Sequence, residues 1–236
     1  HAQNINLSTV DTGFAENAVY NWSKKNKHRT ERSDTAEVGS AIVATGDNIV
    51  VAEDAVNIRA GSLIADQALI VAADRINVDA GRATHDDYSE TYTKKTGFLS
   101  SSTSHRISQN HADTTVGSQL VGDSVTTLST GDTTIKGSTV FGTNGVDMIS
   151  TDGNINLQAS EDRFNNYNYR KDTKSGFGAL GGFSFGKMSN EQGRTGDQIG
   201  HTGSTVASLN GDVNLSARQG SINVQASDIN SQNANV

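Results

Sequence analysis

Residues 49–78 of this chain read IVVAEDAVNIRAGSLIADQALIVAADRINV and carry its clearest structural signal. Short runs of Val, Ile and Leu recur there every six or seven positions, with Asn, Asp, Ala and Gly between them. Ile58 and Val78 occupy equivalent runs 20 residues apart, as do Val51 and Val71. Three short strands in each such turn are typical of a parallel β-helix, whose turns stack about 4.8 Å apart by hydrogen bonding between strands.

The amino-acid composition agrees with a narrow core of this kind. The chain has 236 residues, 33% of them hydrophobic, with 24 Gly but no Pro and no Cys. A closed globular core would need about 45–50% apolar residues, whereas a β-helix needs a few inward side chains in each turn. We predict that Ile58, Val71, Ile135 and Leu157 face inward in such a core. Proline would remove a hydrogen bond from the strand ladder, so its absence also fits a continuous β-helix.

A longer repeat divides the chain into three units. The tripeptide Ile5-Asn6-Leu7 has counterparts at 76–78 and 155–157, and each copy is followed by an aromatic pair and then a basic pair. Each copy later returns through a Val-Gly-Ser or Thr-Gly-Ser segment and a Gly-Asp turn. The three repeats lie at about 5–75, 76–154 and 155–236.

Three polar segments depart from the 20-residue spacing. Their aromatic residues stand two or four positions apart, which places each pair on one side of an extended strand. We predict that these segments are hairpin arms that leave the helix, at about 11–37, 80–113 and 160–201. The predicted fold class is therefore all-β: a right-handed parallel β-helix (solenoid) with long β-hairpin arms, its handedness taken from the crossover rule. We expect a single β-helix segment of a longer chain.

The residue types exclude several kinds of functional site. Without Cys there is no thiolate metal site and no thiol nucleophile. Residues 176–181 match the dinucleotide pattern Gly-x-Gly-x-x-Gly, but the buried strand and the helix that must flank this pattern are missing. The six His lie mostly in the polar arms, without a His-Glu-x-x-His motif or a Gly-Gly-x-Gly-x-Asp calcium repeat. We predict no catalytic, cofactor-binding or metal site, no cofactor and no nucleotide partner.

The charged residues also limit the function. The net charge is −7 and the basic residues are dispersed along the sequence, whereas nucleic-acid binding needs a clustered basic face, so we predict no nucleic-acid partner. Asp47, Asp132 and Asp212 recur at equivalent Gly-Asp turns, which we interpret as turn chemistry. The basic pairs have two possible roles, contact with lipid or lipopolysaccharide phosphates or protection of strand edges. These pairs are Lys24-Lys25, Lys94-Lys95 and Arg170-Lys171.

The third arm contains an unusual apolar segment. Along residues 177–185 one side of an extended strand would carry three Phe, and the other Gly, Leu and Ser. Its length suits a membrane-crossing strand of about 9–11 residues, but the rings could instead fold back onto the β-helix and be buried, as apolar patches usually are. The candidate residues for contact with a membrane or a partner are Phe98, Leu99, Phe177, Leu180, Phe183 and Phe185.

Residues 131–140 (GDTTIKGSTV) and 175–186 (SGFGALGGFSFG), with the recurring Ile-Asn-Leu and Gly-Ser segments, resemble the haemagglutinin repeats of filamentous-haemagglutinin-type exoproteins. The resemblance covers nearly the whole chain, although residues 24–33 of the first repeat stand in place of the Gly-Phe element. Such exoproteins are exported by two-partner secretion in Gram-negative bacteria. They include adhesins and the effectors of contact-dependent growth inhibition, in which this region is implicated in delivering a C-terminal toxin across the target outer membrane.

The resemblance implies a secreted protein on the surface of a Gram-negative bacterium, with an outer-membrane transporter as its partner during export. It also implies contact with the surface or outer membrane of a target cell. We therefore expect a non-enzymatic stalk segment, part of a monomeric filament, that engages the target cell during toxin delivery. Two alternatives stay open: a polysaccharide-processing β-helix enzyme, which would need carboxylates, Arg and Lys clustered on one face, and a passive spacer.

Overall fold

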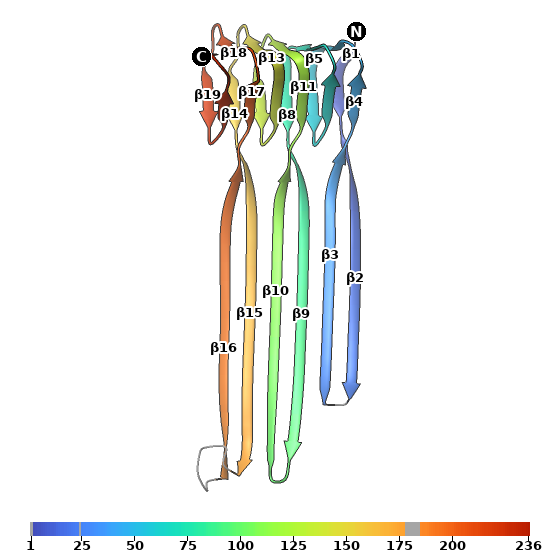
Figure 1. Cartoon of the computed structure of the whole chain (residues 1–236), viewed down its shortest axis with the longest axis vertical. Helices are drawn as coiled ribbons and strands as arrows, with labels where there is room; N and C mark the ends of the chain where they lie inside the picture. Colours follow the sequence, from blue (N-terminus) through green and yellow to red (C-terminus); the bar gives the residue numbers. More distant parts are fainter. Residues whose placement is uncertain (1, 24, 178–184) are drawn as a thin grey trace.

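The computed structural model describes residues 2–23, 25–177 and 185–236, and every element in these residues is a strand. A short parallel β-helix forms one end of the molecule, and three long hairpins extend from it in the same direction (Figure 1). The prediction of an all-β parallel β-helix with long hairpin arms is therefore confirmed.

Fifteen strands build the β-helix and six build the arms. The helix strands are β1 (Ala2–Leu7), β4 (Ala41–Ala44), β5 (Asn48–Arg59), β6 (Ser62–Ala65), β7 (Ala68–Ala73), β8 (Arg75–Asp79), β11 (Gln119–Ser129), β12 (Thr133–Lys136), β13 (Thr139–Ser150), β14 (Ile155–Gln158), β17 (Thr205–Ser208), β18 (Val213–Ala217), β19 (Ile222–Gln225), β20 (Asp228–Asn230) and β21 (Ala234–Asn235). The arms are β2 (Thr9–Ser23) with β3 (Asn26–Gly39), β9 (Gly81–Gly97) with β10 (Ser100–Val116), and β15 (Ser160–Phe177) with β16 (Phe185–Thr202).

The helix has three faces, because β5, β11 and β13 each continue from one face onto the next. The face from which the arms leave, called the arm face below, stacks β1, the end of β5, β8, β12, β14 and β19 in parallel. Each arm departs after a strand of this face, namely β1, β8 or β14. All three arms therefore leave the helix at the same corner.

The core is a set of stacked columns, each with one inward side chain from every turn. On the arm face, the column consists of Leu7, Ile58, Val78, Ile135, Leu157 and Val224. The four side chains that the sequence predicted to face inward, Ile58, Val71, Ile135 and Leu157, are 0–1% exposed, which confirms the prediction. Because a fully buried aliphatic side chain contributes about 1.5–3 kcal/mol, a few such columns stabilise a chain of low apolar content.

One register inferred from the sequence is wrong by a residue. The structure pairs Val50 with Val71, whereas Val51 pairs with Ala72. Val50 is 5% exposed and Val51 is 39% exposed. This turn of the helix spans 21 residues rather than 20, and because successive side chains of a strand point to opposite faces, the extra residue moves Val51 to the outside.

The three recurrent aspartates hold adjacent turns together. The carboxylate of Asp47 accepts a hydrogen bond from the Ala68 backbone N–H at 3.0 Å, and that of Asp132 accepts one from the Asn154 N–H at 2.7 Å. The Asp212 carboxylate accepts one from the Asn233 side-chain amide at 2.9 Å. Their interpretation as turn residues is therefore confirmed.

Thr127 is a polar residue inside an apolar column, between Val71 and Met148. Its side chain is fully buried, and its Oγ1 has no hydrogen-bond partner among the described residues. Because an unsatisfied buried hydroxyl costs about 1–3 kcal/mol, we expect Thr127→Val, which keeps the shape, to raise the free energy of unfolding by about 1 kcal/mol. Urea titration of the two proteins measures this difference; a destabilised Val variant would contradict the assignment.

The arms do not stand apart from one another but form one antiparallel sheet in the order β16-β15-β10-β9-β3-β2. The cause is a match of two spacings. Two turns of the helix separate successive arms, because β12 lies between β8 and β14 on the arm face and the end of β5 lies between β1 and β8. Two turns rise about 9.6 Å, and a two-stranded hairpin is about as wide, since strands are spaced about 4.8 Å apart. Each arm therefore fills the space beside the next without a gap.

Candidate contact site at the ends of the hairpin arms

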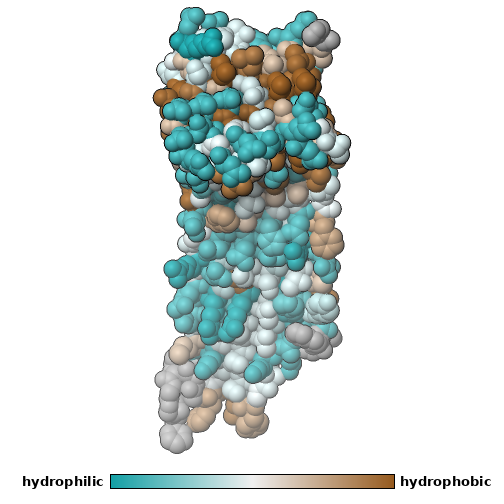
Figure 2. Space-filling view, turned by 45° about the horizontal axis from the view of Figure 1, so that its top comes forward, coloured by the Kyte–Doolittle hydropathy of each residue, from teal (hydrophilic) through white to brown (hydrophobic). Residues whose placement is uncertain are grey.

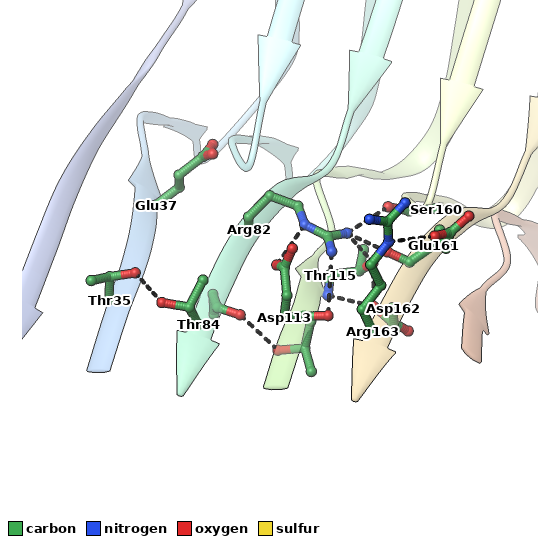
Figure 3. Close-up of polar contacts among 12 residues, drawn as sticks. Thr35, Glu37, Arg82, Thr84, Asp113, Thr115, Ser160, Glu161, Asp162 and Arg163 are labelled. Atoms are coloured by element: carbon green, nitrogen blue, oxygen red, sulfur yellow. Dashed lines mark hydrogen bonds and ion pairs between the residues drawn. The ribbon is translucent and has the colours of Figure 1, made fainter. Parts of the chain in front are cut away.

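A network centred on Arg82 fixes the base of the arm sheet (Figure 3). The Arg82 guanidinium on β9 donates to Asp113 Oδ1 at 2.8 Å on the other strand of its own hairpin, and to the Glu161 carbonyl at 2.5 Å in the next arm. The hydrogen bond to Asp113, opposed in part by burial, raises the pKa of Arg82. Arg82 thus ties the second arm to the third where both leave the helix.

Asp162 strengthens the same junction from the third arm. Its carboxylate is 9% exposed and accepts hydrogen bonds from the Thr115 N–H and Oγ1 and from Thr202 Oγ1, each at 2.7 Å. Burial by itself raises the pKa of Asp162, but the hydrogen bonds from Thr115 and Thr202 outweigh it, and the pKa lies below its ordinary value. Asp162 therefore stays ionised and joins three strands, β10, β15 and β16.

The first arm is fixed to the helix by a separate ion pair. Arg59, at the end of β5, donates to both carboxylate oxygens of Glu37 on β3 at 2.6 and 2.7 Å. The hydrogen bond from Arg59, which outweighs the opposing effect of burial, lowers the pKa of Glu37. Bidentate pairs of this type hold a fixed geometry, so the first arm is anchored close to the corner of the helix.

Histidine–carboxylate pairs connect neighbouring strands in the middle of the sheet. His85 on β9 contacts Asp34 on β3 as well as Asp87, and hydrogen bonds to these two carboxylates raise the pKa of His85. His105 Nε2 lies 2.7 Å from Glu90 Oε1, and this bond lowers the pKa of Glu90 despite the opposing effect of burial. The His85–Asp34 pair adds to the backbone ladder between the first and second arms, and the His105–Glu90 pair adds to the ladder between the two strands of the second arm.

Aromatic side chains form a stripe on one face of the sheet. The His105 ring lies between Tyr92 and Tyr169 in edge-to-face contacts with centroid separations of 6.1 and 5.6 Å. Nearer the helix, a surface hollow of about 670 Å³ is lined by side chains that include Tyr88, Gln109 and Tyr167. Tyr92 of the second arm and Tyr169 of the third, two of the aromatic residues in the predicted arms, are therefore linked through His105.

The far ends of the second and third arms expose large apolar side chains. Phe98 is 93% exposed, Leu99 58%, Phe177 53% and Phe185 71%. Phe98 and Leu99 lie in the turn between β9 and β10, and Phe177 and Phe185 are paired at the ends of β15 and β16. These arm ends are remote from the β-helix (Figure 1). Figure 2 shows the same pattern, with apolar surface on the helix and at the arm ends and a mostly hydrophilic sheet between them. Leu180 and Phe183, also predicted as contact residues, lie outside the described residues.

Lysines that are dispersed in the sequence gather at the same end of the sheet. One row of paired residues crosses the sheet at Asn21, Lys27, Tyr92, His105, Lys171 and Glu191. The segments from this row to the arm ends, 21–27, 92–105 and 171–191, contain eight Lys and two acidic residues, a net charge of +6. The rest of the chain has 11 basic and 24 acidic residues, a net charge of −13. The sequence-based view that the positive charge is dispersed is therefore wrong in three dimensions.

The sequence identified the apolar ends of the arms and the basic pairs, but not the residues that position them. Arg82, Asp162, Glu37 and Arg59 belong to no motif, since their partners come from different strands. The sequence does contain one indication of these contacts, the spacing of one arm per two turns. This spacing predicts that the bases of successive arms lie side by side, where charged residues of different arms can pair.

No group of three or more His, Asp or Glu side chains in residues 2–23, 25–177 and 185–236 is arranged to hold a metal ion. In the same residues there is no helix with the length and apolar character needed to span a membrane.

Comparisons with known proteins agree on one family. The family model described as hemagglutinin repeat matches residues 21–98 and 99–195. The chain is 30% identical over 141 residues to the tRNA nuclease CdiA of Escherichia coli (strain STEC_O31), which is 57% of this chain and 4% of that protein. It is 31% identical over 141 residues to the 16S rRNA endonuclease CdiA of Enterobacter cloacae subsp. cloacae, again 57% of this chain and 4% of the relative.

A third relative, the tRNA nuclease CdiA of Yersinia mollaretii, is 29% identical over 141 residues, which is 57% of this chain and 5% of that protein. The aligned part of the chain therefore spans about one twentieth of the length of these curated relatives. No solved structure matches the chain.

Proposed function

This chain belongs to the hemagglutinin repeat family, and from this premise we propose that the ends of its arms contact the outer membrane of a target cell. The chain is a stalk segment of a secreted cell-surface exoprotein of Gram-negative bacteria. In our proposal the segment engages the target outer membrane while a toxin is delivered, and an outer-membrane transporter exports the protein through two-partner secretion.

The observation that carries the proposal is the joint placement of apolar and cationic side chains at one end of the molecule. Phe98 and Phe185 are 93% and 71% exposed, and the surrounding arm ends carry the net charge of +6 described above. Contiguous exposed apolar groups on a soluble surface commonly indicate a site of interaction with a protein or a membrane. A surface that is both apolar and basic favours an anionic membrane.

The expected energies are large enough for membrane contact. A fully transferred Phe or Leu side chain contributes about 1.5–3 kcal/mol, and each Lys near an anionic leaflet contributes about 1 kcal/mol. Added salt should weaken the second contribution and leave the first nearly unchanged. The arm sheet supports contact as well, because the ends of the second and third arms lie side by side, beyond the end of the shorter first arm (Figure 1).

The same proposal makes this segment non-enzymatic. The relatives are named for tRNA and 16S rRNA cleavage, and we assign any such activity to other parts of the whole protein. In the arms, Arg82, His85 and His105 are each engaged with a carboxylate of a neighbouring strand. These pairs support a structural use of the ionisable groups rather than a catalytic one.

The test is flotation of the protein with vesicles of anionic phospholipid and with outer-membrane vesicles. We compare the parent with a tip variant, Phe98→Ser/Leu99→Ser/Phe185→Ser, in which all three side chains are exposed in the parent. The tip variant should lose at least about tenfold in vesicle partitioning, since 1.4 kcal/mol corresponds to a factor of ten. The parent should bind less tightly as salt is raised.

A matched control removes equally exposed apolar side chains from the helix. Val43, Ile49 and Leu209 lie in the β-helix and are 65%, 62% and 62% exposed. The variant Val43→Ser/Ile49→Ser/Leu209→Ser therefore also replaces three exposed apolar side chains with Ser, but far from the arm ends. This control should float like the parent. Equal recovery of the parent and the tip variant would refute the proposal and favour the passive spacer.

A further inference from the structure

Successive residues of each arm strand point to opposite faces of the arm sheet, and the two faces carry different side chains. One face carries the aromatic stripe described above. The basic pair Arg170-Lys171 is divided between them: the Lys171 ammonium pairs with Glu191 on the aromatic side at 2.7 Å, and Arg170 points to the other side. We call this second side the arginine face, after Arg106, Arg170 and Arg194.

Two of these arginines stand directly opposite each other. Arg106 on β10 pairs with Arg170 on β15, at the junction between the second and third arms and in the interior of the sheet. The Cβ atoms of directly opposed residues lie about 4.5–5.5 Å apart, and like charges in such a pair destabilise a sheet. At the junction between the first and second arms, by contrast, Arg29 faces Glu90. The arginine pair therefore lowers the stability of the arm sheet when nothing lies between the two charges.

Only one of the three guanidinium groups is neutralised within the described part of the chain. Arg170 Nε donates to Asp172 Oδ2 at 2.5 Å, and hydrogen bonds from Ser104 and Arg170 lower the pKa of Asp172, so its carboxylate is ionised at neutral pH. Arg106 and Arg194 form no ion pair and no side-chain hydrogen bond with any described residue. The three arginines and Asp172 together carry a net charge of +2.

The three arginines line one surface hollow of about 770 Å³. Ser108, Asn168 and Gln192 line it too, and no described Asp or Glu does. The Ser108 hydroxyl donates to Asn168 Oδ1 at 3.1 Å, which leaves the amide N–H groups of Asn168 available as donors. The hollow therefore combines a positive charge with hydrogen-bond donors and has no carboxylate in its lining to oppose an anion.

We propose that the hollow on the arginine face is a binding site for a phosphate monoester, held between Arg106, Arg170 and Arg194. A phosphate monoester carries a charge of about −1.5 to −2 at pH 7 and several strong acceptor oxygens, which match the charge and the donors of the hollow. Arginine binds phosphate oxygens through two parallel N–H groups. The anion removes the repulsion between Arg106 and Arg170, which accounts for an opposed pair that the free sheet does not favour.

This site is separate from the ends of the arms. Arg106, Arg170 and Arg194 lie outside the segments 92–105 and 171–191, whose lysines contribute to the positive charge of the arm ends. The phosphate site therefore does not depend on the membrane contact proposed above.

Calorimetric titration with glucose 6-phosphate tests the site, with glucose and glucose 6-sulfate as comparison ligands. The parent should bind glucose 6-phosphate saturably, should not bind glucose, and should bind the singly charged sulfate ester at least about threefold more weakly. The Gln variant, Arg106→Gln/Arg194→Gln, should lose at least about tenfold in affinity for glucose 6-phosphate, because two charge-assisted contacts are removed. The Lys variant, Arg106→Lys/Arg194→Lys, keeps the charge without the paired N–H groups and should lose at least about threefold.

The matched control is Lys136→Gln/Arg218→Gln, which removes the same charge from exposed residues of the β-helix and should bind like the parent. Thermal melting separates binding from folding. Without ligand the Gln variant should melt at or above the Tm of the parent, because the arginine repulsion is gone, and glucose 6-phosphate should raise the Tm of the parent alone. The proposal is overturned by a parent without saturable binding, by equal affinity of the parent and either arginine variant, by equal affinity for the sulfate ester, or by a Gln variant that melts about 3 °C or more below the parent.

Vesicles identify the source of the phosphoryl group. Phosphatidic acid presents a phosphate monoester and phosphatidylglycerol a diester. At equal surface charge, a lipid ligand predicts better flotation of the parent with phosphatidic acid and loss of this preference in the Gln variant, whereas a soluble ligand predicts equal flotation with both. The tip variant Phe98→Ser/Leu99→Ser/Phe185→Ser should lose flotation with both lipids and still bind glucose 6-phosphate, so failure of the membrane proposal and failure of the phosphate site are seen separately.

Discussion

Replacing Ile135 with aspartate is expected to unfold the central turns of the β-helix. Ile135 is fully buried and stacks between Val78 and Leu157 in the column of the arm face. The substitution removes a large apolar side chain, which costs about 2–5 kcal/mol in similar cores, and buries a charge without a partner, which costs more. In a stacked repeat the stability of each turn depends on its neighbours. The unfolding should therefore extend to the turns that carry the second and third arms.

Thermal unfolding followed by circular dichroism measures this effect, and Ile58→Asp repeats the test in another turn of the same column. The matched control is Thr134→Asp, which adds the same charge at the adjacent, outward position of β12. We expect the control to melt close to the parent and both column variants to melt at least 10 °C lower. Column variants that melt like the control would show that the assigned inward register is wrong.

Replacing Asp162 with alanine is expected to detach the third arm from the second at its base. The carboxylate accepts three hydrogen bonds and is 9% exposed, and hydrogen bonds to a charged group contribute about 1.5–3 kcal/mol. Its loss leaves the Thr115 and Thr202 donors without their acceptor. We expect Asp162→Ala to lower the free energy of unfolding by about 2–4 kcal/mol. Hydrogen exchange should speed up most at the junction of β10, β15 and β16.

The pH dependence separates this role from simple packing. The pKa of Asp162 is lower in the folded protein than its ordinary value, so its contribution is fully present above the unfolded pKa and is lost as the pH falls through the folded pKa. The stability difference between the parent and Asp162→Ala should therefore shrink in acid. Asp162→Asn keeps the shape and one acceptor oxygen and should cost less than Ala at neutral pH. An Ala variant as stable as the parent at neutral pH would contradict the anchoring role.

The candidate contact site was partly visible in the sequence. Phe98 and Phe185 stand out because large apolar residues in Gly-, Ser- and Lys-rich segments have no local reason to be buried. The clustering of these residues with lysines could not be seen in the sequence. Lys27, Lys94 and Lys171 are far apart in the chain, and pairing of the three hairpins brings them to the same end of the sheet. A charge count along the sequence cannot detect a pattern created by strand pairing.

The repeating elements of this protein are encoded locally in its sequence. Strand runs of alternating polarity, Gly-Asp turns and the absence of Pro are local features, and each acts within a few residues, so they specify a β-helix with arms before any contact is known. Even so, a single extra residue in one turn was enough to place Val51 outside rather than inside.

The arrangement of the arms, in contrast, depends on contacts between distant parts of the chain. Whether three hairpins stay separate or merge depends on the distance between the points where they leave the helix, and that distance is set by stacked turns of residues remote in sequence. Because two turns of helix and one hairpin have nearly the same width, the arms merge into one sheet. The contacts of Arg82 and Asp162 between the second and third arms and the clustering of lysines at the arm ends follow from that match.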